Sequence, residues 1–334
     1  MALFEFLLLV VFTFVLSKMA VIAVEQAGRL SDYFGISRMA VGMLVVGVIA
    51  SLPELSIAVT SSAAGQGELT AGNVFGANMV LILFAMGMGA ILYGFKVDRK
   101  SLEDIGFVLI ISFLVSIYII YQTQIAGRPI GFLDSMGLFI IFAWYAAKTV
   151  IDKVMHGKRG STTITYRQAP GEQAPKRRES DHGPVIALMF AASILAVYVS
   201  ANVVVGSAIG IASELGLEQS FIGATFISLG TALPEMMMGL AAIRKKMYGV
   251  ALGDAMGSVM ANITLVLGTA AIISPISLHL RVFGVALVFA VIASVLFFYF
   301  AAMRRKFGKA EGLLLCSFYV LYLITIVASQ MGWL

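Results

Sequence analysis

Two glutamates lie in otherwise apolar stretches of this sequence, and each directly follows a proline. Glu54 follows Pro53, and Glu235 follows Pro234. If these stretches span a membrane, each ionised carboxylate costs about 2.5 kcal/mol or more and needs a cation, a proton or a hydrogen-bond donor. No lysine or arginine lies near the centre of either stretch. Two such carboxylates at matching positions favour a transported cation as the partner.

Each proline leaves one backbone carbonyl oxygen without its usual helical hydrogen bond. Proline has no N–H group, so the carbonyl groups of Ile49 and Gly230 lose their helical partners. Such carbonyls persist within a bilayer only where protein or a cavity surrounds them. Hard cations bind carboxylate, carbonyl, amide and hydroxyl oxygens. We therefore expect a broken helix beside each glutamate and an ion site at the two breaks.

Polar residues accompany both glutamates at helical spacing. Ser51 lies three residues before Glu54, and Thr231 lies four before Glu235, so each pair shares a helix face. A polar stripe recurs every fourth residue of a later segment, at Asp254, Ser258 and Asn262. The equivalent positions of the earlier segment are Asn73, Ala77 and Leu81. Two small-xxx-small steps favour close helix packing, at Gly72, Gly76, Gly253 and Gly257.

Composition places these residues in a membrane. The 334 residues are 60% hydrophobic and 12% charged, and the mean hydropathy is +0.97. A soluble domain carries about 25% charged residues, so a soluble enzyme and a nucleic-acid-binding protein are excluded. The apolar residues are enough for ten spans of about 20 residues each. The expected spans are 4–26, 39–64, 69–94, 104–121, 130–151, 184–212, 219–243, 249–273, 281–303 and 311–330.

The sequence contains an internal repeat with an offset of 181 residues. Ser51-Leu52-Pro53-Glu54 matches Ala232-Leu233-Pro234-Glu235, and Gly72-Asn73 matches Gly253-Asp254. Because each copy has five spans, an odd number, the copies cross the membrane in opposite directions. We therefore predict an all-α polytopic membrane protein with ten transmembrane helices in two inverted five-helix repeats, an arrangement typical of transporters.

The basic residues predict the orientation. The connections on one side, including the polar stretch 152–183, hold 19 of the 23 lysines and arginines. Such an excess marks the cytoplasmic side, so both termini are expected to be extracytoplasmic. We predict a first repeat at 1–151, a cytoplasmic linker at 152–183 and a second repeat at 184–334. The chain fits a plasma (inner) membrane.

The two Pro-Glu segments, each followed by a Gly-Asn or Gly-Asp segment, resemble the alpha repeats of the cation/calcium antiporter superfamily. The resemblance implies a secondary antiporter that exchanges a divalent cation, expected to be calcium, for sodium by alternating access. It also implies that the protein has no cofactor, and that its partners are calcium, sodium or protons and the lipid bilayer. Helices 1 and 6 would slide across a core of helices 2, 3, 7 and 8. The family's ligand positions correspond to Ser51, Glu54, Thr231, Glu235, Ser258 and Asn262.

The sequence also departs from the family pattern. Oxygen-bearing ligands are replaced at Ala50, Ala77, Leu81 and Ala232. The middle asparagine of the second copy is Val259, and its first asparagine is Asp254, which either adds a third carboxylate or caps a loop. Fewer ligands favour fewer sodium ions, and proton coupling is the alternative, because a glutamate alone can exchange charge.

Two other classes of function are less consistent with the sequence. A cation channel could be lined by the two broken helices, but the inverted repeat favours an exchanger. An intramembrane enzyme is disfavoured, since an aspartyl protease needs a second membrane aspartate. The three histidines, His156, His182 and His279, all fall in expected loops. The sequence therefore predicts a transporter and not an enzyme.

Overall fold

The computed structural model describes residues 2–34, 41–63, 65, 67–157, 183–214, 228–276 and 280–330. Long apolar runs form helices because only a helix satisfies its backbone polar groups within one segment in lipid. By length and composition, seven helices among the described residues could cross a membrane. The other expected spans are α8 (Phe132–Gly157) and two spans that are broken into shorter helices.

The first half of the chain contains the first five spans. Its elements are α1 (Ala2–Phe34), the π-helix η1 (Gly42–Val46), α3 (Gly47–Ala50), α4 (Leu52–Ala63), α5 (Gly67–Met79), η2 (Val80–Ala85), α6 (Met86–Leu92), β1 (Phe95–Lys96), α7 (Arg99–Ile120), η3 (Tyr121–Ile125) and α8. Helix α1 continues past the expected end of span 1 at residue 26, since nothing between residues 27 and 34 breaks a helix.

The second half repeats the order of the spans, but its strand lies before the last span and not before the fourth. Its elements are α9 (Gly183–Glu214), α11 (Ser228–Thr231), α12 (Leu233–Arg244), α13 (Tyr248–Ala261), η5 (Asn262–Val266), α14 (Leu267–Ile273), α15 (Leu280–Tyr299), η6 (Phe300–Arg304), β2 (Lys306–Phe307) and α16 (Lys309–Gln330). The predicted linker begins inside α8, and its residues 158–182 lie outside the described part of the chain.

The two halves have matching helix boundaries. Adding 181 to the limits of α3, α4 and α6 gives the limits of α11, α12 and α14. The π-helices η2 and η5 also fall at equivalent positions. Segments of π-helix often lie at functional sites, and η5 begins at the predicted ligand Asn262. The internal repeat of the sequence is therefore a repeat of structure.

Two short backbone pairings connect the first repeat to the second. The connection after α6 pairs with the connection before α16, with Phe95 opposite Phe307. The connection after α14 pairs with the connection before α8, with Ile276 opposite Ile130. Residue 276 is the equivalent of residue 95 at the offset of 181. The same type of contact thus occurs twice, with the roles of the two repeats exchanged.

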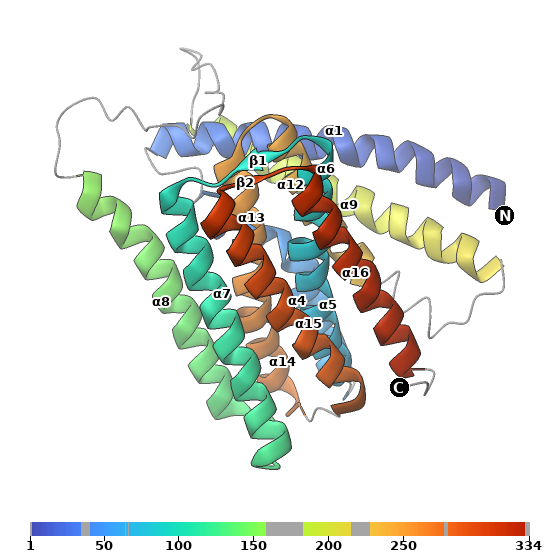
Figure 1. Ribbon diagram of the computed structural model, residues 1–334. Helices are drawn as coiled ribbons and strands as arrows, with labels where there is room; N and C mark the ends of the chain where they lie inside the picture. Colours follow the sequence, from blue (N-terminus) through green and yellow to red (C-terminus); the bar gives the residue numbers. More distant parts are fainter. Residues whose placement is uncertain are drawn as a thin grey trace.

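The interior is centred on α13. Every residue from Val250 to Ala261 on this helix is buried, and α13 packs against η1, α3, α12 and α7. Helices α1 and α9 pack along each other and run at a steep angle to the bundle that contains α7, α8 and α15 (Figure 1). The broken helices therefore lie at the core, and the long pair α1 and α9 lies against it.

Candidate functional site

Each predicted helix break is present directly before a Pro-Glu pair. Helix α3 ends at Ala50, and Ser51 turns with φ −80° and ψ 8° before α4 begins. In the second repeat Ala232 turns with φ −81° and ψ −2° before α12 begins. Proline cannot donate a helical hydrogen bond and its ring crowds the preceding turn. Glu54 and Glu235 therefore both lie in the first turn of a half-helix.

The two glutamates are buried and lack hydrogen bonds. The exposed fraction is 0% for Glu54 and 1% for Glu235. None of the four carboxylate oxygens has a hydrogen-bond partner, and the two carboxyl groups interact electrostatically with each other. Unpaired buried carboxylates are strongly unfavourable unless a cation or proton compensates them. This arrangement is suited to binding a positive charge between the two repeats.

A backbone carbonyl connects the serines of both repeats. The Ser51 hydroxyl donates to the Gly47 carbonyl oxygen at 3.0 Å, and the Ser258 hydroxyl donates to the same oxygen at 3.1 Å. Both serines are buried. Each hydroxyl oxygen retains lone pairs for a cation. Ser51 is one turn before Glu54, so these oxygens lie on the same face of the broken helix.

Two hydrogen bonds to asparagine side chains connect the second repeat to the first. The Thr231 hydroxyl donates to Asn73 Oδ1 at 3.1 Å. It also lies near the Glu54 carboxylate, whose oxygens nonetheless lack a hydrogen bond of suitable geometry. The Asn262 amide nitrogen donates to Asn78 Oδ1 at 3.1 Å, which leaves Asn262 Oδ1 buried without a partner.

Asn78 is a buried polar residue that the sequence analysis did not identify as a candidate ligand. It is 2% exposed, and it occupies the middle asparagine of the family pattern in the first repeat, whose counterpart in the second repeat is Val259. The pattern itself was the signal that could have identified it. Asn78 joins Asn73, Thr231 and Asn262 in the buried polar set.

Asp254 does not cap a loop. It lies within α13, whose N-cap residue is Met247, and its exposed fraction is 2%. Its Oδ1 has no hydrogen-bond partner, and its carboxyl group interacts electrostatically with Glu235. Of the two interpretations of this residue, the third buried carboxylate is therefore the one that the fold supports.

The residues that differ from the family pattern are apolar and buried. Ala77 and Ala232 are both 0% exposed, and Leu81 is 1% exposed. These positions contribute no side-chain oxygen to the centre. Among the described residues, no three histidine, cysteine or acidic side chains gather closely enough to hold a metal ion by themselves. A cation at the glutamates would also need carbonyl, hydroxyl or amide oxygens.

The backbones of the two repeats approach each other closely where α13 crosses η1 and α3. A Cβ atom on Gly257 would lie 2.2 Å from the Met43 carbonyl oxygen, and one on Gly47 would lie 2.9 Å from the Asp254 carbonyl oxygen. The predicted packing role is thus confirmed for Gly257. For Gly72, no described atom lies within 4 Å of such a Cβ. Glycine at this crossing lets α3 and α13 approach closely enough to share polar contacts.

Comparison with known proteins identifies the family. The profile described as "Sodium/calcium exchanger protein" matches residues 4–150 and 185–328. The chain belongs to the sodium/calcium exchanger family. It is a multi-pass membrane protein and a transporter of the cation-exchange type, as the resemblance of the two Pro-Glu segments implied.

Several relatives match over nearly the whole chain. An uncharacterized membrane protein of Methanocaldococcus jannaschii is 28% identical over 304 residues, 91% of each chain. The sodium/calcium exchanger MaX1 of Methanosarcina acetivorans is 23% identical over 326 residues, 91% of this chain and 93% of the relative. A solved structure of the sodium-calcium exchanger NCX_Mj superposes with a TM-score of 0.80 at 23% identity, and covers 98% of this chain and 100% of that one. The exchanger fold is therefore shared.

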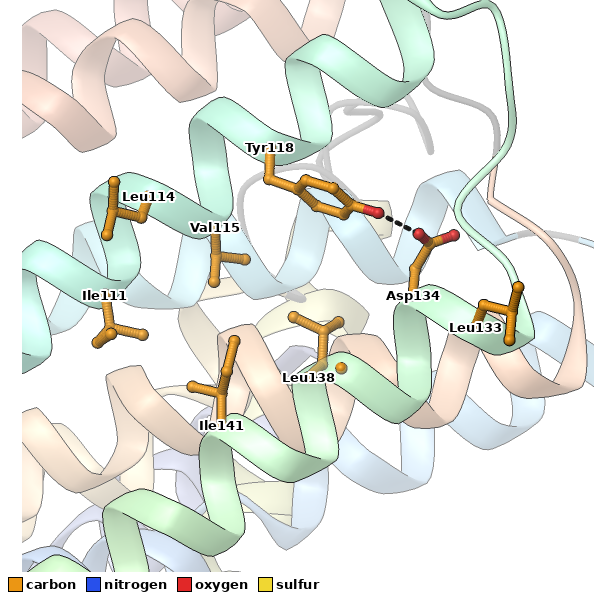
Figure 2. A pocket seen from close by; sticks show the side chains of 9 residues that line it. Ile111, Leu114, Val115, Tyr118, Leu133, Asp134, Leu138 and Ile141 are labelled. Atoms are coloured by element: carbon orange, nitrogen blue, oxygen red, sulfur yellow. Dashed lines mark hydrogen bonds between the residues drawn. The ribbon is translucent and has the colours of Figure 1, made fainter.

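A groove elsewhere in this exchanger is unrelated to the buried carboxylates. It lies between α7 and α8 and has a volume of about 320 Å³ (Figure 2). Its lining is apolar except at one end, where the Tyr118 hydroxyl donates to Asp134. Asp134 also accepts from the Gly131 N–H at 2.8 Å, so its oxygens are occupied. None of the predicted ligands lines this groove.

Proposed function

We propose that this exchanger moves calcium in exchange for sodium, with Glu54 and Glu235 as the ion ligands. The observation that carries the proposal is the set of four buried carboxylate oxygens without partners, two from each repeat. A divalent cation between them neutralises both charges, which removes the penalty of burying them. Sodium ions that replace calcium would restore the same charge balance.

The surrounding oxygens complete the proposed site. At the helix break before Glu54, hard oxygen ligands would come from the Gly47 carbonyl and from the two hydroxyls that bond to it, those of Ser51 and Ser258. Further oxygens of the proposed site belong to Thr231 and Asn73, which bond to each other, and to Asn262, whose Oδ1 has no hydrogen-bond partner. Calcium accepts six to eight oxygens of these mixed types. Pro53 and Pro234 keep the helices broken, so the site cannot close into regular helix.

Access to the site would alternate through movement of α1 and α9. These helices pack along each other and also against α12, which carries Glu235. An ion pair between Glu25 Oε1 and Lys245 Nζ, 2.5 Å apart, connects α1 to the end of α12. The site without an ion carries uncompensated charge, so the protein should change state mainly with ions bound. We place the exchanger in the plasma (inner) membrane, with both termini extracytoplasmic and the linker 152–183 cytoplasmic.

Calcium uptake by proteoliposomes tests this proposal. Vesicles loaded with sodium and diluted into sodium-free medium should accumulate calcium-45, and vesicles with equal sodium on both sides should not. A channel would pass calcium, and current, without any counter-ion. Uptake that is indifferent to a sodium gradient at every pH would contradict sodium exchange.

Protons are a second candidate for the counter-ion. The observation in its favour is that three family ligand positions, Ala77, Leu81 and Ala232, are buried and apolar, so fewer oxygens are present to bind sodium. In this case an acidic vesicle interior should drive calcium-45 uptake in the complete absence of sodium. Collapse of the pH gradient with a protonophore should then abolish uptake. Sodium-driven uptake that survives the protonophore assigns the coupling to sodium.

A further inference from the structure

The groove between α7 and α8 is apolar along its length and polar at one end. Tyr118 and Asp134 form the polar end (Figure 2). Two helical turns further along, about 10 Å at 1.5 Å per residue, Ile111 and Ile141 form the other end. Helix α7 is apolar and long enough to cross a membrane, and Leu133 in the lining is 82% exposed. A groove of this kind on the outer face of two membrane spans is in contact with lipid.

The polar end of the groove lies at the level of the lipid headgroups. Tyr118 and Tyr121 are both exposed near the end of α7, and tyrosine is enriched at the boundary between membrane and water. Asp134 lies in the first turn of α8, and the connection before it carries an exposed arginine, Arg128. A lipid with an acyl chain in the groove therefore has its headgroup next to Asp134.

The last helix of the second repeat begins in the same way, but with a cation added. Gly131 precedes α8 and Gly308 precedes α16, and in both cases the acidic residue three positions later accepts a hydrogen bond from the glycine N–H. This is one of the two hydrogen bonds of a capping box. In the second repeat the acidic residue is Glu311, and Arg304 pairs with it at 3.2 Å. In the first repeat the acidic residue is Asp134.

The first repeat has no counterpart of Arg304. This arginine is the last residue of the π-helix η6, and the last residue of the matching π-helix η3 is Ile125. Within the described part of the chain, no lysine or arginine forms an ion pair with Asp134. Its two oxygens accept one hydrogen bond each, from Tyr118 and from Gly131, and each carboxylate oxygen can accept a second one. An ammonium group from outside the chain can therefore bind where the second repeat has its arginine.

We propose that this groove binds a phospholipid with a primary-amine headgroup, of the phosphatidylethanolamine type. One acyl chain lies in the groove, the ammonium group donates to Asp134, and Arg128 provides a positive charge for the phosphate. A trimethylated ammonium group has the same charge but no N–H donor, and an anionic headgroup would be repelled by the carboxylate. A second copy packed on the groove across a two-fold axis would bring two Asp134 carboxylates together. The proposal does not depend on which ions the exchanger carries.

Native mass spectrometry of the full chain in detergent tests the headgroup preference. The delipidated protein is mixed with equal amounts of dioleoylphosphatidylethanolamine and dioleoylphosphatidylcholine, which differ only in the methylation of the amine. The wild type should bind the primary amine in about tenfold excess, the usual effect of a hydrogen bond to a charged group. Asp134→Asn should bind the two lipids equally. Glu311→Gln removes the matching carboxylate, which already has Arg304 as its partner, and should keep the wild-type preference.

A phosphatidylethanolamine with a photoreactive diazirine in one acyl chain locates the bound lipid. After irradiation, the wild type should carry the label on residues 111–118 of α7 and 134–141 of α8, which line the groove. Asp134→Asn should carry less label there, lower by the same factor as its loss of headgroup preference. Glu311→Gln should be labelled like the wild type.

Several outcomes would overturn the proposal. Equal binding of the two lipids by the wild type does so even if Asp134→Asn fails to fold. Label that is spread evenly over all exposed helices indicates an unspecific lipid film, and a preference that persists in Asp134→Asn removes this carboxylate from the site. Phosphatidylglycerol that displaces phosphatidylethanolamine equally well excludes recognition of the amine. Dimers that protect α7 and α8 from the label assign the groove to a second copy of the chain.

Discussion

Replacement of Glu235 by glutamine should lower the affinity of the purified exchanger for calcium by roughly 100-fold to 1,000-fold. Glutamine keeps the volume and one oxygen but removes the negative charge. Removing one partner of a buried charge interaction costs about 3–5 kcal/mol, and each 1.4 kcal/mol is about tenfold in affinity. Glu54→Gln should have an effect of the same order, because both glutamates are buried and both lack hydrogen bonds. Isothermal titration with calcium measures the change directly.

The control for this experiment is Glu103→Gln, which removes an exposed carboxylate from α7. Its calcium affinity should equal that of wild type. Both glutamate variants should remain folded, since removing an unpaired buried charge relieves an electrostatic penalty. Wild-type calcium affinity in both Glu54→Gln and Glu235→Gln would show that the central site is elsewhere.

Gly257→Ala should lower the thermal stability of the exchanger and abolish calcium transport. The new Cβ atom would lie 2.2 Å from the Met43 carbonyl oxygen and 2.7 Å from Met43 Cα. Both atoms are backbone, so no side chain can rotate away and α13 must move from η1. Overpacking of a core costs about 1–3 kcal/mol, and sometimes more. The same movement would separate Ser258 from the Gly47 carbonyl.

The matched control is Gly137→Ala on α8. Gly137 is also a helical glycine, but a Cβ atom there meets nothing within 4 Å. Alanine is favoured over glycine in a helix by about 0.5–1 kcal/mol, so this variant should be as stable as wild type or slightly more stable. Unfolding temperatures of the purified proteins in detergent distinguish the two cases. Equal stability of Gly257→Ala and Gly137→Ala would contradict the proposed backbone crossing.

Local chemistry made the helix breaks and the repeat predictable. A proline inside a helix removes a hydrogen bond and crowds the preceding turn, which kinks or breaks the helix, so the breaks at Ser51 and Ala232 could be predicted from Pro53 and Pro234. Matching residues 181 positions apart predicted the duplication. The boundaries of α4 and α12 are also 181 positions apart. Burial of Glu54 and Glu235 followed from their apolar neighbours, since a charge in lipid has no other stable place.

Contacts between distant segments could not be predicted in this way. Helical spacing placed Ser258 and Asn262 on one face of α13, but it did not say which helix that face meets. The hydrogen bond between Asn78 and Asn262, and the shared contact of Ser51 and Ser258 with Gly47, depend on how α13 is rotated against the first repeat. Gly257 permits that rotation, because a Cβ atom there would lie 2.2 Å from the Met43 carbonyl oxygen.

The sequence by itself determined the membrane-spanning class, the two-fold repeat and the pair of glutamates beside broken helices, because each follows from composition or from neighbouring residues along the chain. Only the tertiary structure decided which polar side chains of the two repeats contact each other, that Asn78 bonds to Asn262, and that Asp254 faces α12 as a third buried carboxylate. The physical reason is that packing across about 180 residues of separation depends on side-chain shape at the helix crossings, which no local pattern encodes.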